Sequence, residues 1–90
     1  MELLQLKYFY ESATSESFTK TAEKHLIPVS SVSASIKRLE MELGCKLFDR
    51  TSNRITLNQN GKRFHRSLSL IFNELNTVLE ELSQNKSYSR

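Results

Sequence analysis

The sequence contains few of the residues on which disulfides, phosphate loops and membrane anchors depend. It has one cysteine, Cys45, and two glycines, Gly44 and Gly61. A single cysteine excludes an intramolecular disulfide and is typical of a reducing cytoplasm. Two isolated glycines exclude a glycine-rich phosphate loop. No apolar run approaches membrane length, and the N-terminus lacks the basic, then apolar layout of a secretion signal. We therefore expect a cytoplasmic protein with no membrane partner.

Catalytic and metal-binding residues are equally scarce. Cys45, His25 and His65 are the candidates for a nucleophile and its base, but they lie on different expected elements. Cys45 also directly follows the end of an expected helix, where a small buried residue is typical. One cysteine and two scattered histidines do not match the spacing of a structural zinc site. We predict no enzymatic activity, no metal and no cofactor.

Charge is unevenly distributed along the 90 residues, which are enough for one small domain. The formal net charge is +3, yet residues 37–66 hold eight basic and three acidic side chains, and the remainder is acidic on balance. This pattern favours a localised surface for a polyanion, with a solvated face of mixed charge as the alternative. The basic residues are Lys37, Arg38, Lys46, Arg50, Arg54, Lys62, Arg63 and Arg66.

Apolar residues at steps of three and four predict a first helix from about Leu3 to Thr14 and a short second helix after it. Ser17 is the expected N-cap of the second helix. Pro28 ends that pattern, because proline lacks an amide hydrogen and disfavours helix in the preceding residue. The buried side of the second helix is expected to comprise Phe18, Ala22 and Leu26.

The next stretch, PVSSVSASIKRLE, holds four serines in a third expected helix. Either Pro28 is its first residue or Ser30 caps it, and Gly44 ends it in the left-handed conformation. Its apolar side comprises Val29, Val32, Ile36, Leu39 and Leu43. Its opposite side comprises Ser30, Ser31, Ala34, Lys37, Arg38 and Met41, and Ser33 and Ser35 flank the buried edge.

Two β-prone pieces, around residues 47–48 and 55–57, flank the turn-forming segment 51–53 and predict a hairpin with a basic tip. Asn58 then caps a long last helix. Its apolar residues average the 3.5-residue repeat of a coiled coil, and they are Phe64, Leu68, Ile71, Leu75, Val78 and Leu82. A helix of about 25 residues spans roughly 37 Å, more than the width of a domain this small. We therefore favour pairing with a second chain over packing on its own domain.

Helix, short helix, abrupt turn and helix is the arrangement of a helix-turn-helix, whose second helix normally enters the major groove. Small residues and hydroxyls on the outer side of that helix permit a close approach to bases and phosphates. Arg54 at the hairpin could enter the narrow minor groove. Ser17 and Thr19, beside the free amides of a helix start, could hold a phosphate.

Taken together, these residues resemble the N-terminal DNA-binding domain of LysR-type transcriptional regulators, closely over about the first 65 residues. The motifs are Leu6 with Phe9; Ser17-Phe18-Thr19 with Ala22 and Glu23; Ser33, Ile36, Leu39-Glu40 and Leu43-Gly44; and Leu47-Phe48-Asp49-Arg50 with Arg54, Leu57 and Gly61. The resemblance implies a mainly α, winged helix-turn-helix domain of three helices and a two-stranded wing in residues 1–58. It further implies a dimerising linker helix in residues 59–84. Residues 85–90 would be a polar, structureless tail, cut short before a separate effector-binding domain.

With the charge and spacing, the resemblance gives a set of expected DNA contacts: Ser17, Phe18, Thr19, Pro28, Val29, Ser30, Ser31, Ser33, Ala34, Lys37, Arg38, Asn53 and Arg54. Glu40 is expected to pair with Arg50 rather than contact DNA. The chain departs from the family where Pro28-Val29-Ser30-Ser31 replaces the common Ser-Gln-Pro-Ala, and Ala34-Ser35 replaces Arg-Gln. Ser52 and Asn53 likewise replace a glycine and a basic residue. Recognition should therefore rely on close fit, water and DNA shape.

We expect a bacterial regulator that binds a pseudo-palindromic duplex as a homodimer. A small-molecule effector would act only through the absent C-terminal domain. The alternatives are a stand-alone small winged-helix repressor and a helical protein-interaction module that does not bind DNA.

Overall fold

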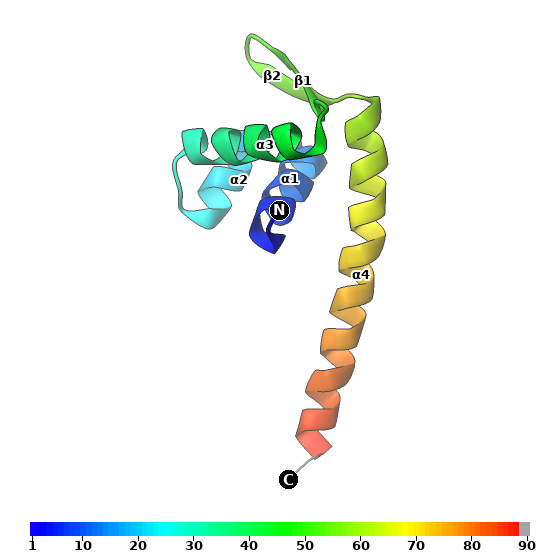
Figure 1. Ribbon diagram of the computed structural model, residues 1–90. Helices are drawn as coiled ribbons and strands as arrows, with labels where there is room; N and C mark the ends of the chain where they lie inside the picture. The colour runs from blue at the N-terminus through cyan, green and yellow to red at the C-terminus, as the bar shows by residue number, and fades with distance from the viewer. Residues whose placement is uncertain (89–90) are drawn as a thin grey trace.

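The computed structural model describes the backbone of residues 1–88 and the side chains of residues 1–84. The chain order is α1 (Leu3–Ser15), α2 (Phe18–His25), α3 (Val29–Leu43), β1 (Phe48–Thr51), β2 (Arg54–Leu57) and α4 (Gln59–Tyr88). In Figure 1, α1, α2 and α3 form a cluster, the β1–β2 hairpin projects beyond α3, and α4 runs along one side and past the cluster. The predicted fold, a winged helix-turn-helix followed by a long helix, is confirmed.

The predicted limits of the first three helices are close to the observed ones. The Ser17 hydroxyl accepts a hydrogen bond from the Lys20 amide at 3.0 Å, which confirms the N-cap of α2. Pro28 occupies the N-cap position of α3, so the helix begins at Val29 and is not capped by Ser30. Gly44 ends α3 with a φ of 76°, the left-handed conformation that its glycine predicted.

Leu26 corrects one expectation. It ends α2 with a φ of 57° and is 91% exposed, so the prediction that it lies on the buried side of the helix is wrong. The left-handed conformation ends the helical path at this residue, so its side chain does not continue the buried face of α2. Ile27 packs against the core in its place.

The core lies between the three short helices, the base of the hairpin and the first half of α4. Its fully enclosed side chains include Phe9, Val32, Ile36, Leu39 and Leu47. The Phe9 ring lies 5.5 Å from the Phe48 ring and 5.2 Å from the Phe64 ring. Val29 and Leu43, expected on the buried side of α3, are 46% and 36% exposed because they occupy its two ends.

An ion-pair cluster joins α1 to α2. Glu11 lies 2.8 Å from Lys24 Nζ and 2.6 Å from His25 Nε2. Partial burial by itself would raise the pKa of Glu11. The hydrogen bonds and charges of Lys24 and His25 outweigh burial and hold this pKa below its ordinary value of 4.5.

The hairpin pairs Phe48 with Leu57 and Thr51 with Arg54, so its strands are longer than predicted and the turn consists of Ser52 and Asn53. Asn58 joins this hairpin to α4. Its side chain accepts from the Gly61 amide at 2.8 Å and donates to the Lys46 carbonyl at 2.9 Å, and its own amide donates to the Leu47 carbonyl at 3.1 Å. The direction of α4 is thereby fixed relative to the wing.

The apolar stripe of α4 is divided between two environments. Leu68 is 2% exposed in the domain core, so the prediction that it contacts a second chain is wrong. Phe64 also packs on the core, against Phe9. Further along, the stripe is exposed at Ile71, Leu75, Val78 and Leu82.

The helix also continues to Tyr88, so the expectation that residues 85–90 form a structureless tail is wrong as far as that residue. The last two residues of the expected tail, 89–90, lie outside the described part. The division into functional segments stays a prediction.

Tyr10 of α1 contacts the first half of α4 through two aromatic rings. Its ring stacks on His65 at 4.6 Å and meets Phe72 edge-on at 5.2 Å. The Thr14 hydroxyl donates to the Tyr10 carbonyl at 2.8 Å, so His65 Nε2 must be the donor in its 2.9 Å hydrogen bond to Thr14. Burial lowers the pKa of His65 from its ordinary value of 6.5.

Candidate nucleic-acid interface

A groove of about 320 Å³ lies between the start of α2, the start of α3 and the wing. It brings together more than half of the predicted DNA contacts, which come from segments far apart in the sequence. Those lining it are Ser17, Phe18, Thr19, Val29, Ser33, Asn53 and Arg54. Asn53 and Arg54 are exposed at the wing tip, so the groove can be reached from solvent on this side.

The remaining predicted contacts lie along α3 outside this groove. Pro28, Ser30, Ala34 and Lys37 are exposed on the outer side of the helix. A second set, Ser31 and Arg38, is exposed at the edge of a separate hollow between α1 and α3. The predicted set therefore covers a continuous surface from the wing, across the outer side of α3, toward α1.

Glu40 and Arg50 hold the wing against α3. The Glu40 carboxylate is buried and accepts hydrogen bonds from the amides of Leu47 at 2.7 Å and Phe48 at 3.3 Å. Arg50 Nη2 lies 3.5 Å from the other Glu40 oxygen. The predicted structural pairing of Glu40 with Arg50 is thus confirmed.

Arg50 also reaches the groove, which the sequence reasoning missed. Its Nη1 donates to Ser33 Oγ at 3.0 Å, and its guanidinium carbon lies 5.0 Å from the centre of the Phe18 ring. Phe18 lines the groove, and its ring meets the Phe48 ring edge-on at 5.4 Å. The cluster of bases in residues 37–66 signalled a basic surface, but not that Arg50 faces a serine of α3.

Glu16 is a further groove residue that the sequence did not indicate. It is exposed and ends α1 in the left-handed conformation, with a φ of 54°. Its carboxylate places one negative charge in a groove whose other charged residues, Arg50 and Arg54, are basic.

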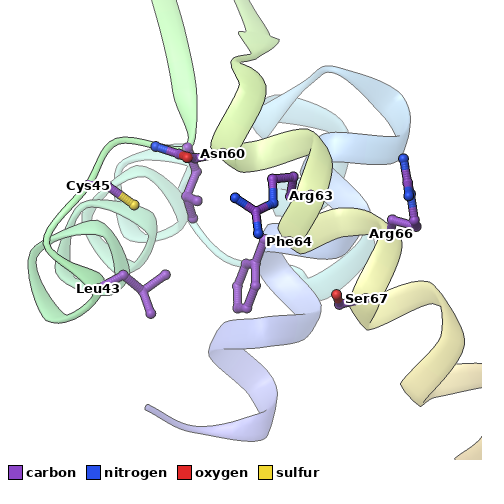
Figure 2. A pocket seen from close by; sticks show the side chains of 8 residues that line it. Leu43, Cys45, Asn60, Arg63, Phe64, Arg66 and Ser67 are labelled. Atoms are coloured by element: carbon purple, nitrogen blue, oxygen red, sulfur yellow. The ribbon is translucent and has the colours of Figure 1, made fainter.

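A different hollow, of about 420 Å³, lies where the α3–β1 loop meets the start of α4. Figure 2 shows Cys45 and Leu43 on one side and Phe64 opposite them, with Arg63 directed toward the loop and Arg66 directed away. Neither histidine lines this hollow.

The three catalytic candidates are therefore not brought together. His25 bonds to Glu11, whereas His65 bonds to Thr14. Within residues 1–88, no cluster of three or more histidine, cysteine or acidic side chains could hold a metal. Over the same range, none of the helices combines the length and apolarity needed to cross a membrane.

Comparison with known proteins gives consistent matches. Residues 3–62 match the family model described as bacterial regulatory helix-turn-helix protein, lysR family. Two similar proteins of Bacillus subtilis (strain 168) are the uncharacterized HTH-type transcriptional regulators YcgK and YybE. YcgK is 37% identical over 84 residues, covering 93% of this chain and 26% of its own length. YybE is 40% identical over 82 residues, covering 91% of this chain and 28% of its own length. The chain thus spans about a quarter of the length of these relatives.

Solved structures agree with the sequence matches. A complex of the BenM DNA-binding domain with catB site 1 DNA superimposes with a TM-score of 0.86 at 30% identity, covering 93% of each chain. A full-length OxyR variant from Pseudomonas aeruginosa gives a TM-score of 0.80 at 27% identity, covering 94% of this chain and 28% of its own. The chain therefore belongs to the LysR family of bacterial regulatory helix-turn-helix proteins.

Proposed function

We propose that this chain is the DNA-binding part of a transcriptional regulator and recognises a double-stranded site. The observation that carries the proposal is the continuous surface formed by the groove and the outer side of α3. With 15 residues, α3 is about 22 Å long, and its outer side exposes the small, polar or basic side chains of Ser30, Ala34 and Lys37 together with Met41. Such a helix fits a major groove about 12 Å wide. The solved complex of the BenM domain supports the same partner.

We propose that the wing enters the adjacent minor groove. Arg54 is exposed at the start of β2, next to the two-residue turn. An arginine in this place meets the enhanced negative potential of a narrow, A·T-rich minor groove. Asn53 beside it can bond to base edges or sugars.

The start of α2 is the proposed phosphate contact. The first amides of a helix have no acceptor within the helix, and they carry the positive end of its dipole. Ser17 already accepts from the Lys20 amide, so its hydroxyl proton remains for a phosphate oxygen. Thr19 adds a second exposed hydroxyl.

Selection of preferred duplexes from a random pool, followed by salt titration, tests DNA binding. Affinity is expected to fall steeply and linearly on a log–log plot as phosphate contacts release counterions. Arg54→Ala is expected to weaken binding most on sites with A·T-rich flanks. Arg63→Ala, which changes a cation outside the groove, is the matched control. No shift of any duplex at low salt would favour the protein-interaction module instead.

We further propose a homodimer formed through α4. Its exposed stripe contains Ile71, Leu75, Val78 and Leu82, which need a partner surface to leave water. Over residues 59–84, the exposed charges of α4 are also sorted along the helix. The basic ones, Lys62, Arg63 and Arg66, precede the acidic ones, Glu74, Glu80 and Glu81. Two copies running antiparallel would bring opposite charges together.

Sedimentation tests the dimer. The double change Leu75→Glu and Leu82→Glu places charge in the stripe and is expected to give a monomer. Thr77→Glu adds one negative charge on another face of the helix and is expected to leave the dimer intact. An unchanged mass for the double variant would refute the proposed interface. A response to a small-molecule effector through a further domain stays a prediction.

A further inference from the structure

Ser33 of α3 has its hydroxyl group fixed by a residue of the wing. Arg50 Nη1 donates to Ser33 Oγ at 3.0 Å. The guanidinium group is held in turn by Glu40, whose Oε1 lies 3.5 Å from Nη2, and by the Phe18 ring at 5.0 Å. Because Glu40 is buried, this arrangement leaves Arg50 little freedom to turn away from Ser33.

Among the side chains and backbone that the structure describes, the Ser33 hydroxyl proton has no acceptor. A serine or threonine in a helix commonly donates to the carbonyl four residues earlier, as Thr14, Ser15 and Thr77 do in this chain. Ser33 does not: within residues 1–84 the one hydrogen bond of its hydroxyl is the one that it accepts from Arg50. Since a cation occupies the accepting side of the oxygen, the proton points away from Arg50. Ser33 lines the groove, and the proton is available there.

We propose that Arg50 makes Ser33 a hydrogen-bond donor only, so that this position of α3 recognises an acceptor atom on the DNA. The inference rests on the proposed DNA binding and adds the chemistry of one contact to it. An unconstrained serine hydroxyl donates or accepts and so tolerates either kind of group. Here a second donor approaching the oxygen would also approach the positive charge of Arg50.

This polarity has a consequence for the sequence that is read. In the major groove guanine offers N7 and O6, adenine offers N7 and thymine offers O4 as acceptors, whereas cytosine offers only a donor. Cytosine is therefore the base disfavoured opposite Ser33. A phosphate oxygen satisfies the same donor without selecting a base. Polarisation by the guanidinium strengthens the bond in either case.

The test measures binding of wild type, Ser33→Ala and Arg50→Met to a selected duplex and its single-base variants. Ser33→Ala is expected to lose on the order of tenfold in affinity. With a base contact, it also loses discrimination against cytosine at one position. In Arg50→Met the hydroxyl regains its acceptor role, and discrimination at that same position is expected to weaken. Ser67→Ala, which removes an exposed hydroxyl of α4 outside the groove, is expected to leave that position unchanged.

Modified duplexes identify the acceptor. A 7-deazapurine at the position, or a neutral methylphosphonate at one flanking phosphate, is expected to weaken wild type and to leave Ser33→Ala unaffected. These measurements on wild type and Ser33→Ala test whether Ser33 donates to the DNA even if Arg50→Met does not fold. Equal binding of Ser33→Ala and wild type to every duplex would overturn the inference while leaving DNA binding intact. Failure of wild type to bind any duplex at low salt would overturn both.

Discussion

Replacing Gly61 with alanine is expected to disturb the junction from which α4 leaves the winged domain. A Cβ atom at this position would lie 2.1 Å from the Leu47 carbonyl oxygen and 2.7 Å from Leu57 Cδ2. The first of these atoms belongs to the backbone and cannot rotate away. To restore a contact of 3.0 Å, the start of α4 would have to move by about 1 Å.

Two opposing effects decide the size of the change. Alanine is the better helix former and contributes roughly 1 kcal/mol in favour of the variant. Against this, the shift strains or breaks the hydrogen bonds by which Asn58 joins α4 to Lys46 and Leu47. Each is worth about 1 kcal/mol, and overpacking adds roughly 1–3 kcal/mol. The net loss is expected to be about 2–4 kcal/mol, a large part of the stability of a small domain.

Urea denaturation followed by circular dichroism, at one fixed protein concentration, measures this loss. Lys62→Ala is the control, because the adjacent exposed side chain of α4 makes no such contact and its removal is expected to change stability by less than about 0.5 kcal/mol. If Gly61→Ala is as stable as wild type, the close approach of α4 to Leu47 is refuted.

Two further changes probe buried contacts. Glu40→Gln keeps the shape of the side chain but removes the charge that accepts from two backbone amides and Arg50, and it is expected to cost about 2–3 kcal/mol in urea denaturation. No loss would mean that the charge is not needed. Because burial lowers the pKa of His65, the folded protein takes up a proton less readily than the unfolded chain. The contribution of His65 to the free energy of unfolding is therefore fully present above pH 6.5 and is lost as the pH falls below that value. His65→Gln is expected to remove this part of the dependence in thermal unfolding, and an unchanged slope would contradict the assignment.

Much of the fold could be predicted because its signals are local. Ser17 and Gly44 terminate helices by interactions within a few residues of themselves, and both act as their residue types indicate. The helical spacing of apolar residues likewise located α1 and α3. The positions and opposite charges of Glu40 and Arg50 also predicted their pairing across α3 and the wing.

The errors arose where burial depends on segments far apart in the sequence. The stripe of α4 has one uninterrupted pattern, yet Leu68 lies in the domain core whereas Leu75 is 38% exposed. The difference depends on how far along α4 the contacts with Phe9 and Tyr10 of α1 extend. The periodicity of α4 does not contain that information. The groove could not be predicted for the same reason. The contact of Arg50 with Ser33 depends on the position of the hairpin relative to α3.

Leu26 shows how a local signal can be absent although the conformation is present. It adopts the left-handed conformation that Gly44 adopts, with φ values of 57° and 76°, and its side chain is 91% exposed. This conformation costs a non-glycine residue about 1–2 kcal/mol, and the greater freedom of glycine in the unfolded chain offsets part of that. Leu26→Gly is therefore expected to stabilise the fold by about 0.5–1 kcal/mol in denaturation. Gly44→Ala, where a Cβ would meet nothing within 4 Å, isolates the same backbone effect with the opposite sign. A destabilised Leu26→Gly alongside a destabilised Gly44→Ala would mean that the leucine side chain, and not backbone strain, decides the stability of this turn.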